Sequence, residues 1–205
     1  MSGTLYIIAA PSGAGKTSLV RALLEREPEI SLSVSYTSRM PRSNEVDGQH
    51  YHFVSREVFE HMAKAGAFFE YANVHGDYKG TAREAVEPLL ESGRDILLEI
   101  DWQGAQQVRQ QWPDSLSIFI LPPSRAELER RLRHRASDSA EQIARRLVDS
   151  RVEIARAAEF DYIVINDDFA TAIDDLRAIF AARRLRRDAQ LVRHASLLDN
   201  LLKSV

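Results

Sequence analysis

The apolar residues of this chain fall into two kinds of pattern. Four short runs are almost wholly apolar and predict buried parallel strands, at residues 5–9, 95–100, 116–121 and 162–165. The segments between and after them carry apolar residues at helical spacing, which predicts helices that begin near residues 16, 103, 124, 140 and 169. Strands that alternate with helices in this way predict an α/β fold, with a parallel sheet flanked by helices.

One long segment after the first helix interrupts this alternation. It holds three β-prone pieces, 33–37, 51–54 and 68–74, and one amphipathic helix at 56–65. Short strands in close succession predict an inserted α+β subdomain rather than further strand–helix–strand units. Near its end, Thr81 is followed three residues later by Glu84, a capping-box pattern that predicts a helix start at Thr81.

These patterns divide the chain into four parts. We assign residues 1–32, 82–122 and 159–186 to the core, 33–81 to the inserted subdomain, 123–158 to a helical lid and 187–205 to a helical tail. The lid is a pair of arginine-rich helices joined by a flexible connector, as a moving lid requires. The tail carries leucines that could dock on its own core or on a partner chain, so the sequence leaves the choice between a monomer and a homo-oligomer open.

The turn after the first strand has the composition of a phosphate-binding loop. It reads Ala10, Pro11, Ser12, Gly13, Ala14, Gly15, Lys16 and Thr17. Its glycines allow the backbone N–H groups to approach a polyphosphate, and the helix that follows adds its positive N-terminal dipole. Lys16 supplies an ammonium for the β- and γ-phosphates of ATP, and Thr17 a hydroxyl for Mg²⁺. The common motif begins with glycine, and Ala10 is a small-for-small change that removes no phosphate donor.

Two other interpretations of this turn fit less well. A chance glycine turn would not carry the strict Gly15-Lys16-Thr17 order between a strand and a helix. A dinucleotide-binding turn needs a third glycine at a fixed spacing after Gly15, and none follows there.

Composition narrows the class of protein. The 205 residues suit one domain with subdomains or two small domains, with 44% hydrophobic and 28% charged residues. A net charge of -3 gives no sign of nucleic-acid or anionic-membrane binding. The chain has no cysteine, which excludes disulfides and thiolate chemistry and fits a reducing cytoplasm. We expect neither a signal peptide nor a membrane span, because the start leads directly into a strand and no apolar run is long enough.

The inserted segment holds candidate ligands for a second, smaller substrate. Arg39 and Arg42 lie three residues apart in a polar loop, and Tyr51 follows on the next predicted strand. Paired guanidinium donors and a phenol suit a phosphate monoester, although a solvated basic loop would have the same composition. Glu70 lies within a predicted strand, where it is either an edge charge or a buried acceptor. A buried carboxylate accepts from guanine N1–H and N2–H₂ together, whereas adenine offers no such pair of donors.

Further candidates lie beside the predicted core strands and on the lid. Glu99 and Asp101 end the most apolar strand, where acids can hold Mg²⁺ through water or orient an acceptor, or simply meet solvent. Arg146 lies next to the apolar stripe of its helix, so it needs a partner, which is either Asp149 or Glu153 or a nucleotide phosphate. Arg135 ends the preceding helix, where the helix dipole alone would favour a cation.

Two clusters point away from metal and nucleic-acid binding. His50 and His52 can share a strand face, but no third ligand follows nearby. The basic run 183–187 has acidic surroundings and helical spacing, which favours a solvated helix face.

Five ordered motifs together resemble the guanylate kinase family, in its bacterial form. They are residues 10–17, Ser38-Arg39-Met40-Pro41-Arg42, Gly48-Gln49-His50-Tyr51, Ile100-Asp101-Trp102-Gln103-Gly104 and Val164-Ile165-Asn166-Asp167-Asp168. The resemblance covers about residues 4–186. It implies a P-loop core, a GMP-binding insertion and a lid, and an enzyme that transfers the γ-phosphoryl of Mg·ATP to GMP, and possibly to dGMP, without nucleic acid or membrane as partner.

The resemblance also assigns roles to individual positions. For ATP it implies the loop residues 10–17 together with Asn166, near the adenine. For GMP it implies guanine contacts from Ser35, Glu70 and Thr81, and phosphate contacts from Arg39, Arg42 and Tyr51. We add Lys79, Glu99 and Asp101 to the GMP site. The residues expected to act on the transferring phosphoryl are Lys16, Arg42, Arg135 and Arg146.

Two positions depart from the family pattern. Lys79 stands where the family often has a second tyrosine in Gly76-Asp77-Tyr78-Lys79-Gly80, so it would bind phosphate as a point charge. Glu99 stands where the family has aspartate, which moves the carboxylate out by one methylene. Two rival functions remain. A P-loop kinase for another acceptor would not need Glu70, and a non-enzymatic scaffold module would not need an intact Lys16 and Thr17.

Overall fold

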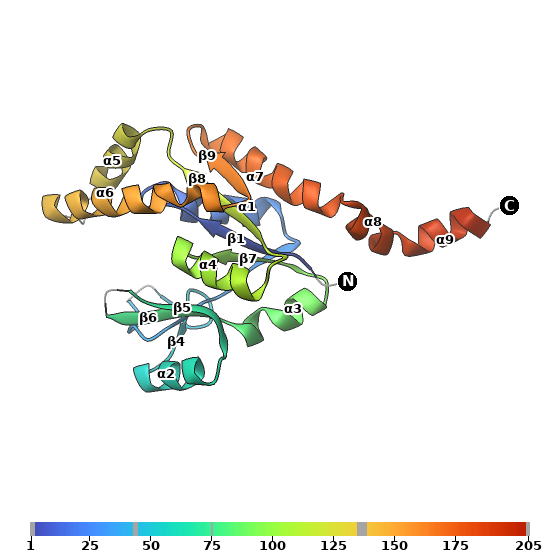
Figure 1. The fold of residues 1–205 in the computed structure, drawn as a ribbon, viewed down its shortest axis with the longest axis horizontal. Helices are drawn as coiled ribbons and strands as arrows, with labels where there is room; N and C mark the ends of the chain where they lie inside the picture. The colour runs from blue at the N-terminus through green and yellow to red at the C-terminus, as the bar shows by residue number, and fades with distance from the viewer. Residues whose placement is uncertain (1–2, 43–44, 75, 135–138, 204–205) are drawn as a thin grey trace.

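The computed structural model describes residues 3–42, 45–74, 76–134 and 139–203 (Figure 1). Its core is a five-stranded parallel sheet in the order β2-β7-β1-β8-β9. The strands are β1 Leu5–Ala9, β2 Ile30–Leu32, β7 Asp95–Glu99, β8 Leu116–Leu121 and β9 Tyr162–Ile165. The predicted α/β fold is confirmed. The short edge strand β2 was not predicted, because three residues are too few to show a period.

The central strand β1 is buried on both faces, which explains its continuous apolar run. Tyr6 and Ile8 join a cluster with helices α1 and α7, whereas Leu5 and Ile7 join a second cluster with α3 and α4. The helices are α1 Lys16–Arg26, α3 Glu87–Glu91, α4 Trp102–Gln111 and α7 Phe169–Arg184. Helices on both faces are the arrangement that a parallel sheet requires. They bring the loops that follow β1 and β7 to one edge of the sheet.

A second sheet of four strands lies below the core in Figure 1, in the order β4-β3-β6-β5. Its elements are β3 Tyr36–Thr37, β4 His52–Phe53, α2 Arg56–Lys64, β5 Phe68–Val74 and β6 Asp77–Ala82. The ring of Phe59 on α2 stacks on Phe68 and on Tyr78, at centroid distances of 4.4 and 5.2 Å. This aromatic cluster gives the small sheet an apolar core of its own.

The predicted helix start at Thr81 is wrong. Thr81 lies within β6 and pairs with Glu70 on β5, and the strand continues to Ala82. A 3₁₀ turn at Arg83–Ala85 follows, and α3 begins only at Glu87. Pairing with β5 satisfies the backbone here, so Thr81 needs no helix to cap, and its hydroxyl is free for another partner.

Two helices, α5 Arg125–His134 and α6 Ala140–Ala155, lie at the left of Figure 1, above the small sheet. A 3₁₀ turn at Ala157–Glu159 leads from α6 to β9. Leu128 and Leu132 of α5 pack with Ile143 of α6. Ser139 caps α6 through a reciprocal capping box with Gln142. The predicted site residue Arg135 and most of the predicted connector lie outside the described residues.

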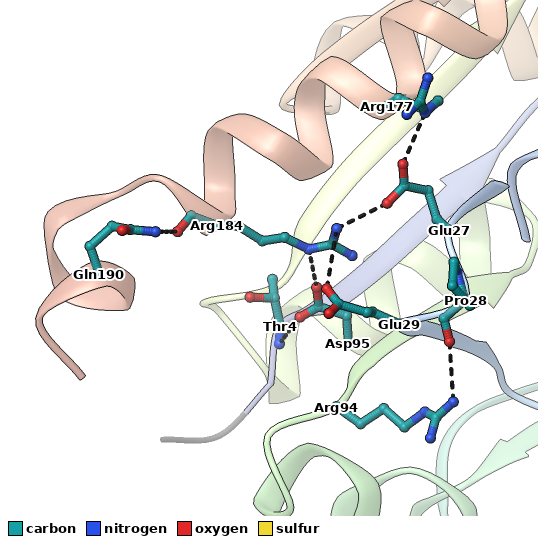
Figure 2. Close-up of polar contacts among 9 residues, drawn as sticks. All are labelled: Thr4, Glu27, Pro28, Glu29, Arg94, Asp95, Arg177, Arg184 and Gln190. Carbon is teal, nitrogen blue, oxygen red and sulfur yellow. Dashed lines mark hydrogen bonds and ion pairs between the residues drawn. The ribbon is translucent and has the colours of Figure 1, made fainter. Parts of the chain in front are cut away.

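The chain ends in an arm that projects away from the lid and the small sheet, formed by α8 Arg187–Arg193 and α9 Ala195–Lys203 (Figure 1). Arg184, in the last turn of α7, joins the arm to the core. Its guanidinium lies 2.9 Å from Glu27 and 3.2 Å from Asp95, as Figure 2 shows. A cavity of about 670 Å³ lies at this junction, at the end of the strands remote from the P-loop, and no predicted site residue lines it. Among the described residues, no helix is long and apolar enough to cross a membrane.

Candidate active site

The loop between β1 and α1 depends on two glycines in the left-handed region. Gly13 and Gly15 both have φ of +93°. A Cβ on Gly13 would lie 2.9 Å from the side chain of Leu132, and one on Gly15 would lie 2.4 Å from Asn166 Nδ2. Both positions therefore exclude a side chain on conformational and on steric grounds. Helix α1 begins at Lys16, directly after Gly15.

The acids that end β7 lie beside this loop, as the sequence predicted. Thr17 Oγ1 donates a hydrogen bond to Glu99 Oε1 at 2.5 Å. Lys16 Nζ donates to the carbonyl of Ile100 at 2.7 Å. Burial lowers the pKa of Lys16, and the carboxylates of Glu99 and Asp101 oppose that shift. Lys16 is held at the sheet edge, with its ammonium toward the carboxyl end of β7.

Asn166, after β9, contacts the backbone of the loop. It is buried, and its Nδ2 donates to the carbonyl of Ala14 at 2.7 Å. Arg131 of α5 donates to the same carbonyl at 3.3 Å and to the carbonyl of Asn166 at 2.9 Å. Glu127 accepts from Arg131 Nε at 2.7 Å. Arg131 was not predicted, because in sequence it is one of several arginines that lie four residues from a glutamate.

Glu70 is a buried acceptor and not an edge charge. Its side chain is 7% exposed, and Oε1 accepts from Thr81 Oγ1 at 2.7 Å. Burial raises the pKa of Glu70 to about 7, and the neighbouring charge of Asp101 acts in the same direction. Oε2 faces Gly104 at the start of α4, where a Cβ would lie 2.9 Å away. Asp101 caps that helix by accepting from the Gly104 amide at 2.8 Å.

Arg39 is fixed by an acid that was not predicted. Arg39 Nη2 donates to both carboxylate oxygens of Glu45, at 2.8 and 2.9 Å. Glu45 Oε2 also accepts from the Arg42 amide at 2.7 Å. These bonds to Arg39 and Arg42 lower the pKa of Glu45 to about 2. In the sequence Glu45 is one acid in a polar loop, and no spacing rule separates it from its neighbours.

Lys79 belongs to the same cluster as the predicted phosphate ligands. Its Nζ lies 5.5 Å from the centroid of the Tyr51 ring, and Arg39 Cζ lies 5.8 Å from it. The charge of Lys79 also acts to lower the pKa of Lys16, so the cations of the two sheets face a common space. For two other predicted ligands, Ser35 and Arg42, the described part of the chain shows no side-chain hydrogen bond or ion pair.

The second lid helix approaches the loop from the other side. Arg146 on α6 is half-buried, whereas Arg145 is exposed, as the stripe of apolar residues predicted. Seven residues later, Glu153 Oε2 accepts from the Ser12 amide at 3.2 Å. Burial raises the pKa of Glu153, and the like charges of Asp101 and Asp149 add to that shift. Glu153 was considered in the sequence only as a partner for Arg146.

Comparison with known proteins identifies a family. The family model described as guanylate kinase matches residues 2–183. A guanylate kinase from Xanthomonas campestris is 59% identical over 202 residues, which cover 98% of this chain and 100% of that protein. One from Xylella fastidiosa is 59% identical, with 98% and 99% covered. The crystal structure of guanylate kinase from Anaplasma phagocytophilum has a TM-score of 0.74 and 32% identity, and covers 91% of this chain and 88% of that chain.

The family match spans the P-loop, the small sheet and both lid helices, and it ends at residue 183, before the projecting arm. The relatives from Xanthomonas and Xylella align over almost all of the chain, arm included. Sequence and fold agree, and the chain belongs to the guanylate kinase family.

Proposed function

We propose that the side chains between the two sheets carry out the reaction of the guanylate kinases, with ATP on the P-loop and GMP against the small sheet. The chain is an ATP:GMP phosphotransferase by family. The observation that carries the site assignment is the place of Glu70. The carboxylate of Glu70 is buried against the start of α4. That helix begins only a few residues after Glu99, and Glu99 contacts Thr17 of the P-loop. The base of GMP at Glu70 and the phosphates of ATP at Thr17 would then lie on either side of the carboxyl end of β7.

ATP binds along residues 10–17 in this proposal. The loop amides that follow Ser12 contact the phosphates together with Lys16, and Asn166 shapes the adenine side of the loop. Arg131, bonded to the Ala14 and Asn166 carbonyls, supports the same region.

The Thr17 hydroxyl and the Glu99 carboxylate are oxygen donors of the kind that Mg²⁺ prefers, so these residues fit the ion. The described residues hold no group of three or more His, Cys, Asp or Glu side chains suited to a metal. ATP itself would therefore supply further ligands, as is usual for Mg²⁺ bound with a nucleotide. When bound, the ion supplies charge neutralisation at the phosphates.

GMP binds with its base at Glu70 and its phosphate at the cationic cluster. Ionised Glu70 accepts from N1–H and N2–H₂ of guanine, and its partner Thr81 belongs to the same base site. We assign Ser35 and Asp101 to this base site as well. Arg39, Arg42, Tyr51 and Lys79 take the phosphate. Glu45 holds Arg39 in place through two hydrogen bonds, so this guanidinium is preorganised before GMP arrives. Lys79 and Thr81, one from each set, lie two residues apart on β6.

Transfer requires positioned cations and no covalent intermediate. The transition state spreads negative charge over the transferring phosphoryl, and Lys16, Arg42, Arg135 and Arg146 are placed by this proposal to stabilise it. Residues 123–158 act as a lid whose closure brings the lid arginines in and excludes water, which would otherwise accept the phosphoryl. Residues 33–81 form the GMP-binding part. We place the enzyme in the cytoplasm, where its nucleotide substrates are, and dGMP is a further acceptor to be tested.

The test is ADP release from Mg·ATP with GMP, AMP, CMP and UMP offered in turn. The proposal predicts turnover with GMP and at least about 100-fold lower kcat/KM with the other three, because they leave Glu70 unpaired. Turnover with another monophosphate would keep the P-loop assignment and discard the base assignment. A folded protein that binds ATP but transfers to none of the four would favour the scaffold alternative.

A further inference from the structure

An acidic side chain contacts the P-loop in a site built for polyanions. Glu153 of α6 accepts from the Ser12 amide at 3.2 Å, and the carboxylates of Asp101 and Asp149 are close enough to raise its pKa. Placing a third carboxylate there is unfavourable unless something offsets the repulsion. Two groups do so. The Ser12 N–H donates a hydrogen bond to it, and the charge of Lys16 attracts it.

The two lid helices are held by different contacts. Helix α5 rests directly on the loop, because Leu128 and Leu132 pack against Gly13 and Arg131 bonds the carbonyl of Ala14. The apolar face of α6 is instead turned to α5, through Ile143 and the residues packed around it. Apolar packing against a neighbouring helix allows α6 to slide or rotate, whereas a hydrogen bond to a backbone amide fixes one point of it.

The hydrogen bond between Glu153 and Ser12 lies on the face of α6 that also carries Arg146. Residues seven apart on a helix share a face, so Glu153 and Arg146 project in nearly the same direction, about 10 Å apart along the axis. A helix pinned to Ser12 at Glu153 therefore presents Arg146 toward the same loop.

We propose that Glu153 is a positioning residue, whose bond to the Ser12 amide holds α6 against the P-loop and so places Arg146 for phosphoryl transfer. The inference rests on the proposed function, because Arg146 acts there on the transferring group. Glu153 itself contacts the backbone of the loop, at the Ser12 amide. In this proposal its effect on the rate is exerted through Arg146.

The first experiment compares Glu153→Ala with Glu153→Gln, and uses Glu141→Ala as the matched control. Glu141 is an exposed acid in the first turn of the same helix. Glu153→Ala should lower kcat at least about tenfold and leave the KM for GMP within about twofold, because only the placement of the lid changes. Glu153→Gln should recover most of kcat, since its amide oxygen still accepts from Ser12. Glu141→Ala should retain full kcat.

The second experiment is a double-mutant cycle with Arg146→Ala. If Glu153 acts through Arg146, then Glu153→Ala should lower kcat less than about twofold in the Arg146→Ala background. Multiplicative effects would overturn the proposal. So would a lower KM for ATP with unchanged kcat in both Glu153 variants, because that result would make Glu153 a competitor of the phosphate.

A third measurement separates this inference from the proposed function. Amide hydrogen exchange in the nucleotide-free protein needs no turnover. Glu153→Ala should accelerate exchange across α6, whereas Glu141→Ala should not. Unchanged exchange in Glu153→Ala would overturn the proposal even if the enzyme phosphorylates GMP. If the wild type transfers nothing while α6 loosens as expected, the function fails and the anchoring contact stands.

Discussion

Thr81 donates its hydroxyl hydrogen to the carboxylate of Glu70 across neighbouring strands, at 2.7 Å and out of contact with solvent. The bond helps to hold the carboxylate in one orientation, and it favours the ionised form. Burial outweighs it, so the pKa of Glu70 rises to about 7. In the proposed site this carboxylate is costly to ionise when empty and would gain two donors from guanine. We therefore expect Glu70 to determine both the base selectivity and the pH dependence of the site.

The pKa of Glu70 predicts a loss of stability with rising pH. Its folded value of about 7 lies above the ordinary value of 4.5, so the folded state keeps its proton longer than the unfolded state. The raised pKa of Glu70 contributes fully to the free energy of unfolding below about pH 4.5, and this contribution is lost as the pH rises through about 7. Glu70→Gln removes this dependence. We expect it to be more stable than wild type at pH 8, by up to about 3 kcal/mol, and similar near pH 4.

Urea unfolding of both proteins across this pH range checks the prediction. The difference between the two midpoints should grow between pH 5 and pH 8. A constant difference would mean that Glu70 ionises in the folded protein at its ordinary pKa. Thr81→Val, which removes the hydroxyl donor and keeps the shape, should push the pKa of Glu70 further up and deepen the loss at pH 8.

Removal of the P-loop cation should affect the rate far more than the fold. We expect Lys16→Ala to lower kcat at least about 100-fold, because its ammonium stabilises charge that develops on the phosphoryl group. The melting temperature should change by less than about 3 °C, since burial of the charge is itself unfavourable and its loss offsets the lost hydrogen bond to Ile100. Steady-state kinetics and calorimetry test this together, and parallel large losses in both would contradict it.

Lys79, a departure from the usual family tyrosine, should matter for GMP and not for ATP. Lys79→Met removes one cation from the group around Tyr51. We expect the KM for GMP to rise about tenfold and that for ATP to stay within about twofold. The KM for GMP should also depend less on salt in the variant. Lys64→Met, on the exposed end of α2, is the control. If both substitutions raised the KM for GMP equally, the KM would depend on the net charge of the protein and not on the position of Lys79.

The junction between α7 and the core should be important for stability. Arg184 is largely buried and lies between Glu27 and Asp95, which are also largely buried (Figure 2). Arg184→Met would leave both carboxylates without that partner, at a cost of about 2 kcal/mol in the free energy of unfolding. Arg186→Met should cost less than about 0.5 kcal/mol, because Arg186 is exposed. Denaturant titrations of the two variants give the comparison, and equal midpoints would contradict the assignment.

How far the sequence could predict the site depends on whether a contact is local. The P-loop, its strand and its helix are consecutive, so spacing and residue type define them. The acids after β7 were predicted because the carboxyl ends of parallel strands meet at one edge. The sequence left open whether Glu70 is exposed, since that depends on α4, which folds over it from another part of the chain.

Two of the three residues that were missed act across long separations, whereas Glu45 contacts Arg39 and Arg42 within its own loop. Arg131 meets Ala14 and Asn166, and Glu153 meets Ser12, in contacts that join the lid to the loop. Each lies on a helix with several similar charges, so no local pattern distinguishes it. The wrong prediction for Thr81 came from relying on a local pattern. Its local pattern was right for a cap, but pairing with β5 was available and satisfied the backbone first.

The most direct test of the account is the preference for GMP over IMP, measured as kcat/KM with wild type and with Glu70→Gln. IMP keeps N1–H and lacks the N2 amino group, so it can donate only one of the two hydrogen bonds to the Glu70 carboxylate. The account predicts that wild type prefers GMP at least about tenfold, and that Glu70→Gln lowers this preference toward one. The same preference in both proteins would contradict the account, because guanine would then be recognised by groups other than Glu70.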